Sequence, residues 1–230
     1  MNWKFFSILG YAPAIVESDL AFDNIDLITS HSFWNPAPPG VGLLRWRDLD
    51  LERGRYLHAW TNSMSWRDMD VDFINQFYSD IYQVGVNAIT PWAVIQTDDW
   101  LEGDPNPGTA FRVEGEEEYT VLPGYYFYKQ MTTAGQPGMQ VAHTYSSNPD
   151  IVVMAFASGD TDNPNAFVIL NRDESGRDVE IRLRNSAANT FSAYRSSPDE
   201  KYNDIGRVKV KRAILEYEAP ARSVTTFFSN

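Results

Sequence analysis

Residues 206–218 read GRVKVKRAILEYE, and this stretch decides the fold of the second half of the chain. Val208 and Val210 alternate with lysine or arginine residues. Leu215 and Tyr217 alternate with glutamates. A period of two is typical of a β-strand that has one face in the core and the other in water. The stretch therefore predicts two amphipathic strands.

The same kind of pattern continues on both sides of this stretch. Turn sequences separate several of the apolar runs, namely Asn163-Pro164-Asn165, Glu174-Ser175-Gly176 and Ser197-Pro198-Asp199. Eight strands are predicted, at 139–146, 150–157, 165–171, 177–184, 189–195, 206–211, 213–218 and 222–228. Short antiparallel strands at this spacing predict a β-sandwich over residues 136–230.

Residues 1–135 show a different pattern, in which strand-like and helix-like segments alternate. Apolar runs at 25–31, 56–62 and 86–92 predict buried strands. A helical spacing of apolar residues over 71–81 lies between the last two, with Asp68 or Asp70 as its cap. This order predicts parallel strands with right-handed crossovers.

A hairpin and a helix complete the first part. The hairpin is predicted at 109–113 and 118–122, and the helix covers 125–133, between Pro123 and Gly135.

Composition restricts the kinds of partner. The net charge of −12 argues against nucleic acid and against an anionic membrane surface. Aromatic residues make up 14% of the chain, and their flat faces suit stacking against sugar rings as well as core packing. With no cysteine and three histidines, neither a metal nor a cofactor is expected. Residues 1–16 do not have the pattern of a signal peptide, and no apolar run is long enough to span a membrane.

Three groups of residues resemble glycoside hydrolase family 30, which belongs to the large (β/α)8 clan of retaining glycosidases. The ending APARSVTTF, residues 219–227, resembles the last sandwich strand of that family. Residues 125–139 resemble its last barrel helix and the Pro-Gly turn that follows. The strings SHSF at 30–33, WTN at 60–62 and PW at 91–92 resemble the ends of barrel strands six, seven and eight.

This resemblance implies a fold of the α/β class joined to an all-β part. Residues 1–135 would be a partial (β/α)8 TIM barrel containing the last three βα units, and residues 136–230 an antiparallel β-sandwich. The implied partner is a polysaccharide or an oligosaccharide, together with a missing amino-terminal barrel portion. The sequence does not indicate where this chain resides, but the parent enzyme would be secreted or periplasmic.

The resemblance also implies that this chain cannot hydrolyse a glycosidic bond by itself. In the clan the general acid/base follows strand four, which is absent here, and the nucleophile is a Glu at the end of strand seven. Asn62 stands at that position, and an amide cannot form the glycosyl-enzyme ester. No catalytic residue is therefore assigned. Even in another register, no Glu lies between Arg53 and Glu102.

Substrate contacts are expected at the carboxyl ends of the barrel strands, where loops build the site. His31 and Asn62 are candidates for hydrogen bonds to hydroxyls, and Trp92 for a sugar platform. The predicted set of substrate-binding residues is His31, Trp34, Trp60, Asn62, Trp92 and Gln96. In the sandwich, Tyr194 and Tyr202 are interpreted as packing and turn residues rather than as a sugar site.

Two functional hypotheses remain open beside an inactive fragment. One is a non-catalytic carbohydrate-binding or scaffold protein, which Asn62 favours over a working enzyme. The other is an active enzyme whose nucleophile is Asp98 or Asp99. Three strands cannot close a barrel, so the sequence also suggests a truncated or incompletely recorded gene product.

Overall fold

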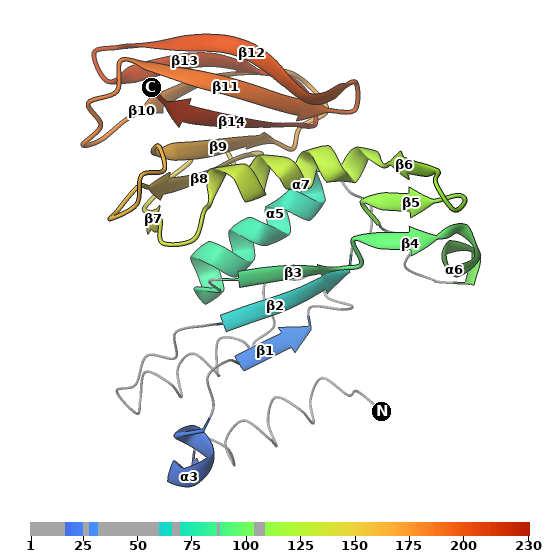
Figure 1. The fold of residues 1–230 in the computed structure, drawn as a ribbon. Coiled ribbons are helices and arrows are strands. Elements are labelled where there is room, and N and C mark those ends of the chain that lie inside the picture. The colour runs from blue at the N-terminus through green and yellow to red at the C-terminus, as the bar shows by residue number, and fades with distance from the viewer. Residues whose placement is uncertain (1–16, 25–27, 32–59, 66–69, 87, 104–108) are drawn as a thin grey trace. The chain divides into compact units, whose positions relative to one another are not determined.

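The computed structural model of the protein describes residues 17–24, 28–31, 60–65, 70–86, 88–103 and 109–230 (Figure 1). The chain forms two compact units. The first comprises Met1–Ser65 and Ser79–Trp92, and the second comprises Trp66–Tyr78 and Ala93–Asn230. No described helix has the length and apolarity needed to cross a membrane.

Three parallel strands characterise the first unit. They are β1 (Ile28–His31), β2 (Trp60–Ser65) and β3 (Ala88–Trp92), and they pair in that order. The predicted parallel, adjacent strands are thus confirmed, while their place in a barrel stays a prediction. The unit also contains a short helix, α3 (Asp19–Phe22), which Ser18 caps by accepting a hydrogen bond from the Ala21 amide at 3.3 Å.

The middle strand differs from its predicted limits. β2 continues to Ser65, three residues beyond Asn62. The extension forms because residues 63–65 pair with Thr90, Pro91 and Trp92 of β3. The prediction that this strand ends at Asn62 is therefore wrong, and residues 56–59 lie outside the described part of the chain.

An eight-stranded antiparallel sheet dominates the second unit. Its order is β10-β13-β12-β11-β14-β9-β8-β7. The bounds are β7 (Gln140–Ala142), β8 (Ile151–Ala157), β9 (Ala166–Asn171), β10 (Arg177–Arg182), β11 (Thr190–Ser197), β12 (Glu200–Lys211), β13 (Ile214–Ala219) and β14 (Ser223–Ser229). All eight predicted strands are present, although β12 begins six residues earlier than expected.

The predicted β-sandwich takes the form of one continuous sheet that curls on itself. The long strand β12 makes this possible, because most of its length pairs with β11 while Val210 and Lys211 pair with β13. The curl brings Tyr217 of β13 against β14. Its hydroxyl lies 2.7 Å from Thr225 Oγ1, and its ring meets that of Phe227 edge-on at 5.1 Å.

The apolar core lies inside the curl. Phe167 stacks on Phe227 with ring centroids 4.6 Å apart, and Phe191 meets Phe167 edge-on at 5.1 Å. Fully or nearly fully buried side chains around them are Ile151, Ile169, Ala193 and Leu215. The alternating apolar residues of β10, β12 and β13 pack against this cluster from the other side. The period-two pattern of these strands therefore places their apolar side chains against the core, as expected.

Helix α7 (Pro123–Ala134) packs against the sheet on the other side from the curl core (Figure 1). Its buried residues Phe127, Gln130, Met131 and Ala134 recur at helical spacing. After the helix, Pro137 and Gly138 form the predicted turn, with the Met139 amide donating to the Gln136 carbonyl at 3.1 Å. Gly138 has φ +85°, a conformation that only glycine adopts easily. Helix α7 precedes residue 135 and the sheet follows it, so the helix and the sheet that it covers lie on opposite sides of the predicted domain boundary.

Ser196 joins α7 to two strands through one buried hydroxyl. Ser196 Oγ accepts from Gln130 Nε2 at 2.8 Å and donates to the Tyr126 carbonyl at 3.0 Å. It also accepts from the Tyr202 amide at 3.2 Å. Beside it, Thr226 Oγ1 donates to the Gln130 carbonyl at 3.0 Å. The helix is thus held in one register on the sheet.

A second helix and a small sheet complete the unit. Helix α5 (Val71–Tyr78) buries Val71, Phe73, Ile74 and Phe77 and contacts α7, β8 and β9. In the sequence it continues into a π-helical segment, Ser79–Val84, which belongs to the first unit. The small sheet contains β4 (Ile95–Thr97), β5 (Phe111–Val113) and β6 (Tyr119–Val121), with α6 (Asp98–Gly103) between the first two. The predicted hairpin is β5 with β6.

A bidentate salt bridge between Arg195 and Glu200 stabilises the β11–β12 hairpin. The two Arg195–Glu200 nitrogen–oxygen distances are both 2.6 Å, and about a fifth of each side chain is exposed. The hydrogen bonds from Arg195 lower the pKa of Glu200 below its ordinary value of 4.5. A two-residue turn, Pro198-Asp199, connects the strands, as the sequence predicted.

Replacing Glu200 by Gln removes the negative charge that pairs with Arg195. At pH 7 we expect the free energy of unfolding to fall by about 1.5–3 kcal/mol, measured by urea denaturation. Glu200→Gln has a matched control in Glu180→Gln, whose pair with Arg182 is exposed and whose loss should cost less than about 1 kcal/mol.

The same variant predicts a pH dependence. Because the pKa of Glu200 is lowered on folding, its contribution is present above the unfolded value near 4.5 and disappears as the pH falls through the folded value. The stability difference between wild type and Glu200→Gln should therefore shrink in acid. A difference that stays constant down to acid unfolding would contradict the ion-pair interpretation.

Replacing Ser196 by Ala leaves the side-chain amide of Gln130 and the backbone amide of Tyr202 without their partner. We expect a loss of about 2–3 kcal/mol in the free energy of unfolding, because each unsatisfied buried group costs about 1–3 kcal/mol and neighbouring losses do not add fully. Ser175→Ala is the control, since Ser175 is exposed and its change should stay within about 0.5 kcal/mol. Equal stability of both variants would show that the hydroxyl does not hold α7.

Candidate functional site

The carboxyl ends of β1, β2 and β3 are the predicted site, and the backbone pairing gives their relative levels. β1 ends at His31 and β3 ends at Trp92, as predicted. His31 is level with Ser63 of β2, while Trp92 is level with Ser65, two positions further on. Since strand positions alternate between faces, positions 31 and 92 belong to the same face of this sheet.

Asn62 occupies a different register position. It is level with Ser30 of β1 and Ile89 of β3. It therefore lies one position before the level of His31, on the other face of the pleat. The register thus brings positions 31 and 92 to one face and does not bring position 62 there. On that face, β2 contributes Ser63 and Ser65.

The other predicted binding residues are distributed over both units. Trp60 is the first residue of β2, and Trp34 lies outside the described residues. Gln96 is the middle residue of β4 in the second unit and is only 7% exposed. Binding roles for all six residues stay predictions.

None of the three parallel strands contains an acidic residue: their sequences are ITSH, WTNSMS and AITPW. A retaining glycosidase needs two carboxyl groups about 5–5.5 Å apart. The described strands therefore contain neither of these carboxyl groups, whatever the register of Asn62.

Asp98 and Asp99, the alternative carboxylates, begin helix α6 and are exposed. Asp98 Oδ1 lies 3.3 Å from Arg112 Nε, and Arg112 also pairs with Glu114. Acidic residues in the first turn of a helix also complement its dipole. Both features are ordinary for solvent-exposed acidic residues at the start of a helix.

Asp70 and Asp72, which follow β2 in sequence, have structural partners. Asp70 caps α5, since its Oδ1 accepts from the Asp72 amide at 2.8 Å. Arg222 Nη2 lies 2.5 Å from Asp70 Oδ2 and 2.7 Å from Asp72 Oδ2, and Arg172 also bonds Asp72. Burial raises the pKa of Asp72, but the hydrogen bonds from Arg222 and Arg172 together lower it. These carboxylates therefore hold α5 to the ends of β9 and β14.

Within the described ranges, no group of three His, Asp or Glu side chains is arranged to hold a metal ion.

The described side chains that converge on a groove lie in the second unit. They come from the end of α7, the β8–β9 loop and strands β11, β12 and β14. Of this group, the sequence singled out Tyr194 and Tyr202, and it favoured packing for both. The missed signal is the pairing of β11 with β12 and β14, which no local pattern reports.

Solved structures with a similar fold include several glycoside hydrolases. A family 30 endoxylanase from Clostridium papyrosolvens C71 matches 94% of this chain with a TM-score of 0.73 and 17% identity. A family 30 subfamily 8 xylanase from Clostridium acetobutylicum matches 95% with a TM-score of 0.74 and 16% identity. The fold is similar to that of family 30 glycoside hydrolases.

The match to family 30 is partial in length. This chain covers 52% of each of the two xylanases and 45% of an endo-β1,6-glucanase, which matches 96% of this chain with a TM-score of 0.60 and 16% identity. The chain thus spans about half the length of these proteins. Identities this low establish the fold alone. Neither a protein-family model nor a curated protein sequence matches the chain.

Proposed function

We propose that this chain is the carboxy-terminal portion of a polysaccharide-degrading glycoside hydrolase and that it cannot catalyse hydrolysis unaided. The parallel order β1-β2-β3, followed by the curled sheet, supports this proposal. So does the match to about half of each family 30 structure over nearly all of this chain. Xylan and β1,6-glucan are the substrates that the names of these proteins suggest.

The observation that carries the proposal is the absence of any carboxylate in the three described parallel strands. Hydrolysis with retention requires one carboxyl group to protonate the leaving oxygen and a second to attack the sugar carbon. An amide or hydroxyl at positions 62, 63 or 65 replaces neither group. Such residues can still form hydrogen bonds with sugar hydroxyls.

The edge strands of the three-stranded sheet are consistent with a missing barrel portion. Within the described residues, β1 and β3 each pair with one neighbour only. Barrels abolish such edges by closure, and an open edge invites pairing with other chains. Strands from an amino-terminal portion would complete the hydrogen bonding and bring the general acid/base.

A non-catalytic carbohydrate-binding protein is the second candidate. The same lack of carboxylates favours it, because binding requires shape and hydrogen bonds but no nucleophile. Binding of a saccharide without turnover, in a chain that needs no barrel partner, distinguishes it from the first candidate.

The catalytic part of the proposal predicts that the isolated chain releases no reducing sugar from xylan or β1,6-glucan. Asn62→Glu should remain equally inactive, because a restored nucleophile still lacks its general acid. If the wild type is active and Asp98→Asn or Asp99→Asn abolishes that activity, the nucleophile lies in α6 and the proposal is wrong.

The fragment part of the proposal predicts an open reading frame upstream of the codon for Met1. That frame should encode five further βα units, with a Glu after the fourth strand. Sequencing the genomic DNA and the transcript tests this directly, and an in-frame stop codon immediately upstream would contradict it. Co-expression of the encoded segment with this chain should then increase the yield of soluble protein, because the open edges become paired.

A further inference from the structure

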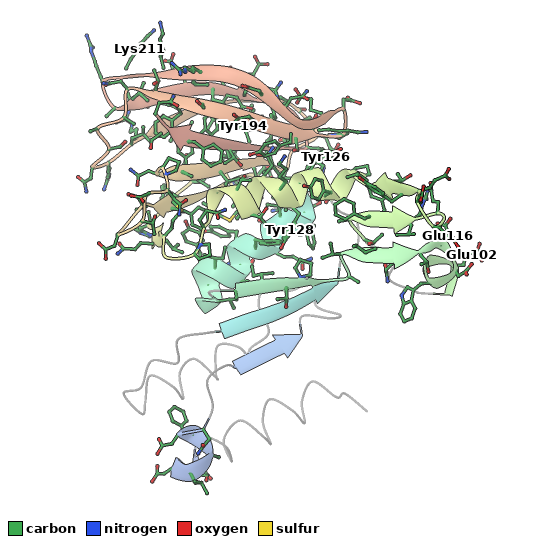
Figure 2. The ribbon with its side chains drawn as sticks, in the orientation of Figure 1. Glu102, Glu116, Tyr126, Tyr128, Tyr194 and Lys211 are labelled. Carbon is green, nitrogen blue, oxygen red and sulfur yellow. The ribbon has the colours of Figure 1, made fainter. Side chains whose placement is uncertain are left out.

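A shallow groove of about 540 Å³, wide open to solvent, lies on the second unit between the end of α7, the β8–β9 loop and strands β11, β12 and β14. Tyr194, which Figure 2 labels on the curled sheet, belongs to its wall. All of its residues come from one compact unit, so the groove does not depend on the parallel strands.

None of the ten side chains that line the groove is charged, although the chain carries a net charge of −12. Four are rings and six are amides or hydroxyls. The rings are Tyr194, Tyr202, Phe228 and Pro164. An uncharged lining that mixes rings with amides and hydroxyls suits a neutral ligand that is itself amphipathic, with apolar faces and a rim of hydroxyl groups.

The aromatic wall is built by stacking. The rings of Tyr194 and Tyr202 lie parallel, with centroids 5.0 Å apart and an interplanar angle of 12°. Phe228 meets Tyr194 edge-on at 6.0 Å, and all three side chains remain partly exposed. Burial raises the pKa of Tyr202, whose hydroxyl donates to Thr133 Oγ1 at 3.1 Å. The wall is therefore fixed before any ligand arrives, which reduces the entropy lost on binding.

Tyr202 is held in a backbone conformation that tyrosine disfavours. Its φ is +56°, in the left-handed region, which costs a bulky L-residue about 1–2 kcal/mol. The register between β11 and β12 shifts on either side of Arg195, and the Ser196 hydroxyl accepts from the Tyr202 amide. Irregularities of this kind redirect a side chain, here toward the stack with Tyr194.

The polar side of the groove retains hydrogen-bonding capacity. The side-chain amide of Asn163 has no protein partner within the described residues, and it offers both donors and an acceptor. Ser192 Oγ donates to Asn230 Oδ1 at 2.8 Å, which fixes that amide at the rim. Sugar hydroxyls both donate and accept, so such a rim matches them.

We propose that this groove is a non-catalytic binding site for a neutral saccharide chain. A sugar ring packs its C–H face against Tyr194 and Phe228, because the Tyr202 ring is covered by Tyr194 and by Lys129 Nζ, which lies 4.2 Å from its centroid. Its hydroxyls bond the amide of Asn163. The site goes beyond the proposed function, because it requires neither a barrel nor a reaction. It also applies equally to either candidate function.

Native affinity electrophoresis of the full chain tests the proposal, with xylan, xyloglucan or β1,6-glucan cast separately in the gel and a polysaccharide-free gel as reference. We expect at least one polysaccharide to retard the wild type. Tyr194→Ala and Asn163→Ala should each raise the dissociation constant at least about tenfold, which corresponds to about 1.4 kcal/mol. Asn163→Ala removes only a loop side chain, so it keeps the test valid if Tyr194→Ala does not fold.

Tyr145→Ala is the matched control, because Tyr145 is 86% exposed in the same unit and lies outside the groove. Its affinity should equal that of the wild type. The proposal is overturned if no polysaccharide retards the wild type, or if Asn163→Ala and every folded Tyr194 variant bind as the wild type does. Loss of binding in Asn62→Ala with unchanged binding in the groove variants would place the saccharide on the parallel strands and would also overturn it.

Discussion

The central strands of the curled sheet, β9, β14 and β11, have two faces that must both be kept from water. One face meets the strands that curl over it, and the other meets α7. The second contact depends on a polar group, the Ser196 hydroxyl, which bonds Gln130 Nε2, the Tyr126 carbonyl and the Tyr202 amide. Because a shift of the helix would break these buried hydrogen bonds, the network fixes the helix in one register. The same bonds determine the conformation at Tyr202, so the aromatic wall follows from the requirement to cover the sheet.

Strands β10, β12 and β13 were predictable because their alternate residues pack on the core, and a period of two can be read from the local sequence. Residues 200–205 of β12 are the exception. Glu200, Asn203 and Asp204 disfavour strands, yet the segment belongs to β12 because its backbone pairs with β11 and Glu200 pairs with Arg195 of that strand. The curl was not predictable either, since it depends on β12 sharing its pairing between β11 and β13. Both features depend on pairing between strands, which no local sequence pattern reports.

The candidate site was likewise predictable only in part. The order of the parallel strands and the ends of β1 and β3 followed from apolar runs, and they are confirmed. The end of β2 was misjudged, because Ser63-Met64-Ser65 carries no strand signal of its own and extends only through pairing with β3. A register shift of one residue changes the face, so this small error matters for Asn62. The groove around Tyr194 was beyond reach, since a positive φ at a tyrosine and the meeting of three strands leave no mark in the sequence.

The division into units has a genetic consequence. Residues 66–78 belong with the curled sheet, through Arg222 and its bonds to Asp70 and Asp72, while the segments on both sides belong to the other unit. The chain therefore passes between the units after residues 65, 78 and 92. A cut in the gene that keeps both covering helices with the sheet must come before α5, and it then also carries residues 79–92 of the other unit, whereas a piece starting at residue 136 would leave α5 and α7 behind. Recombination that moves the curled sheet into another protein must therefore carry α5 and residues 79–92 along, or lose the helix that covers part of the sheet.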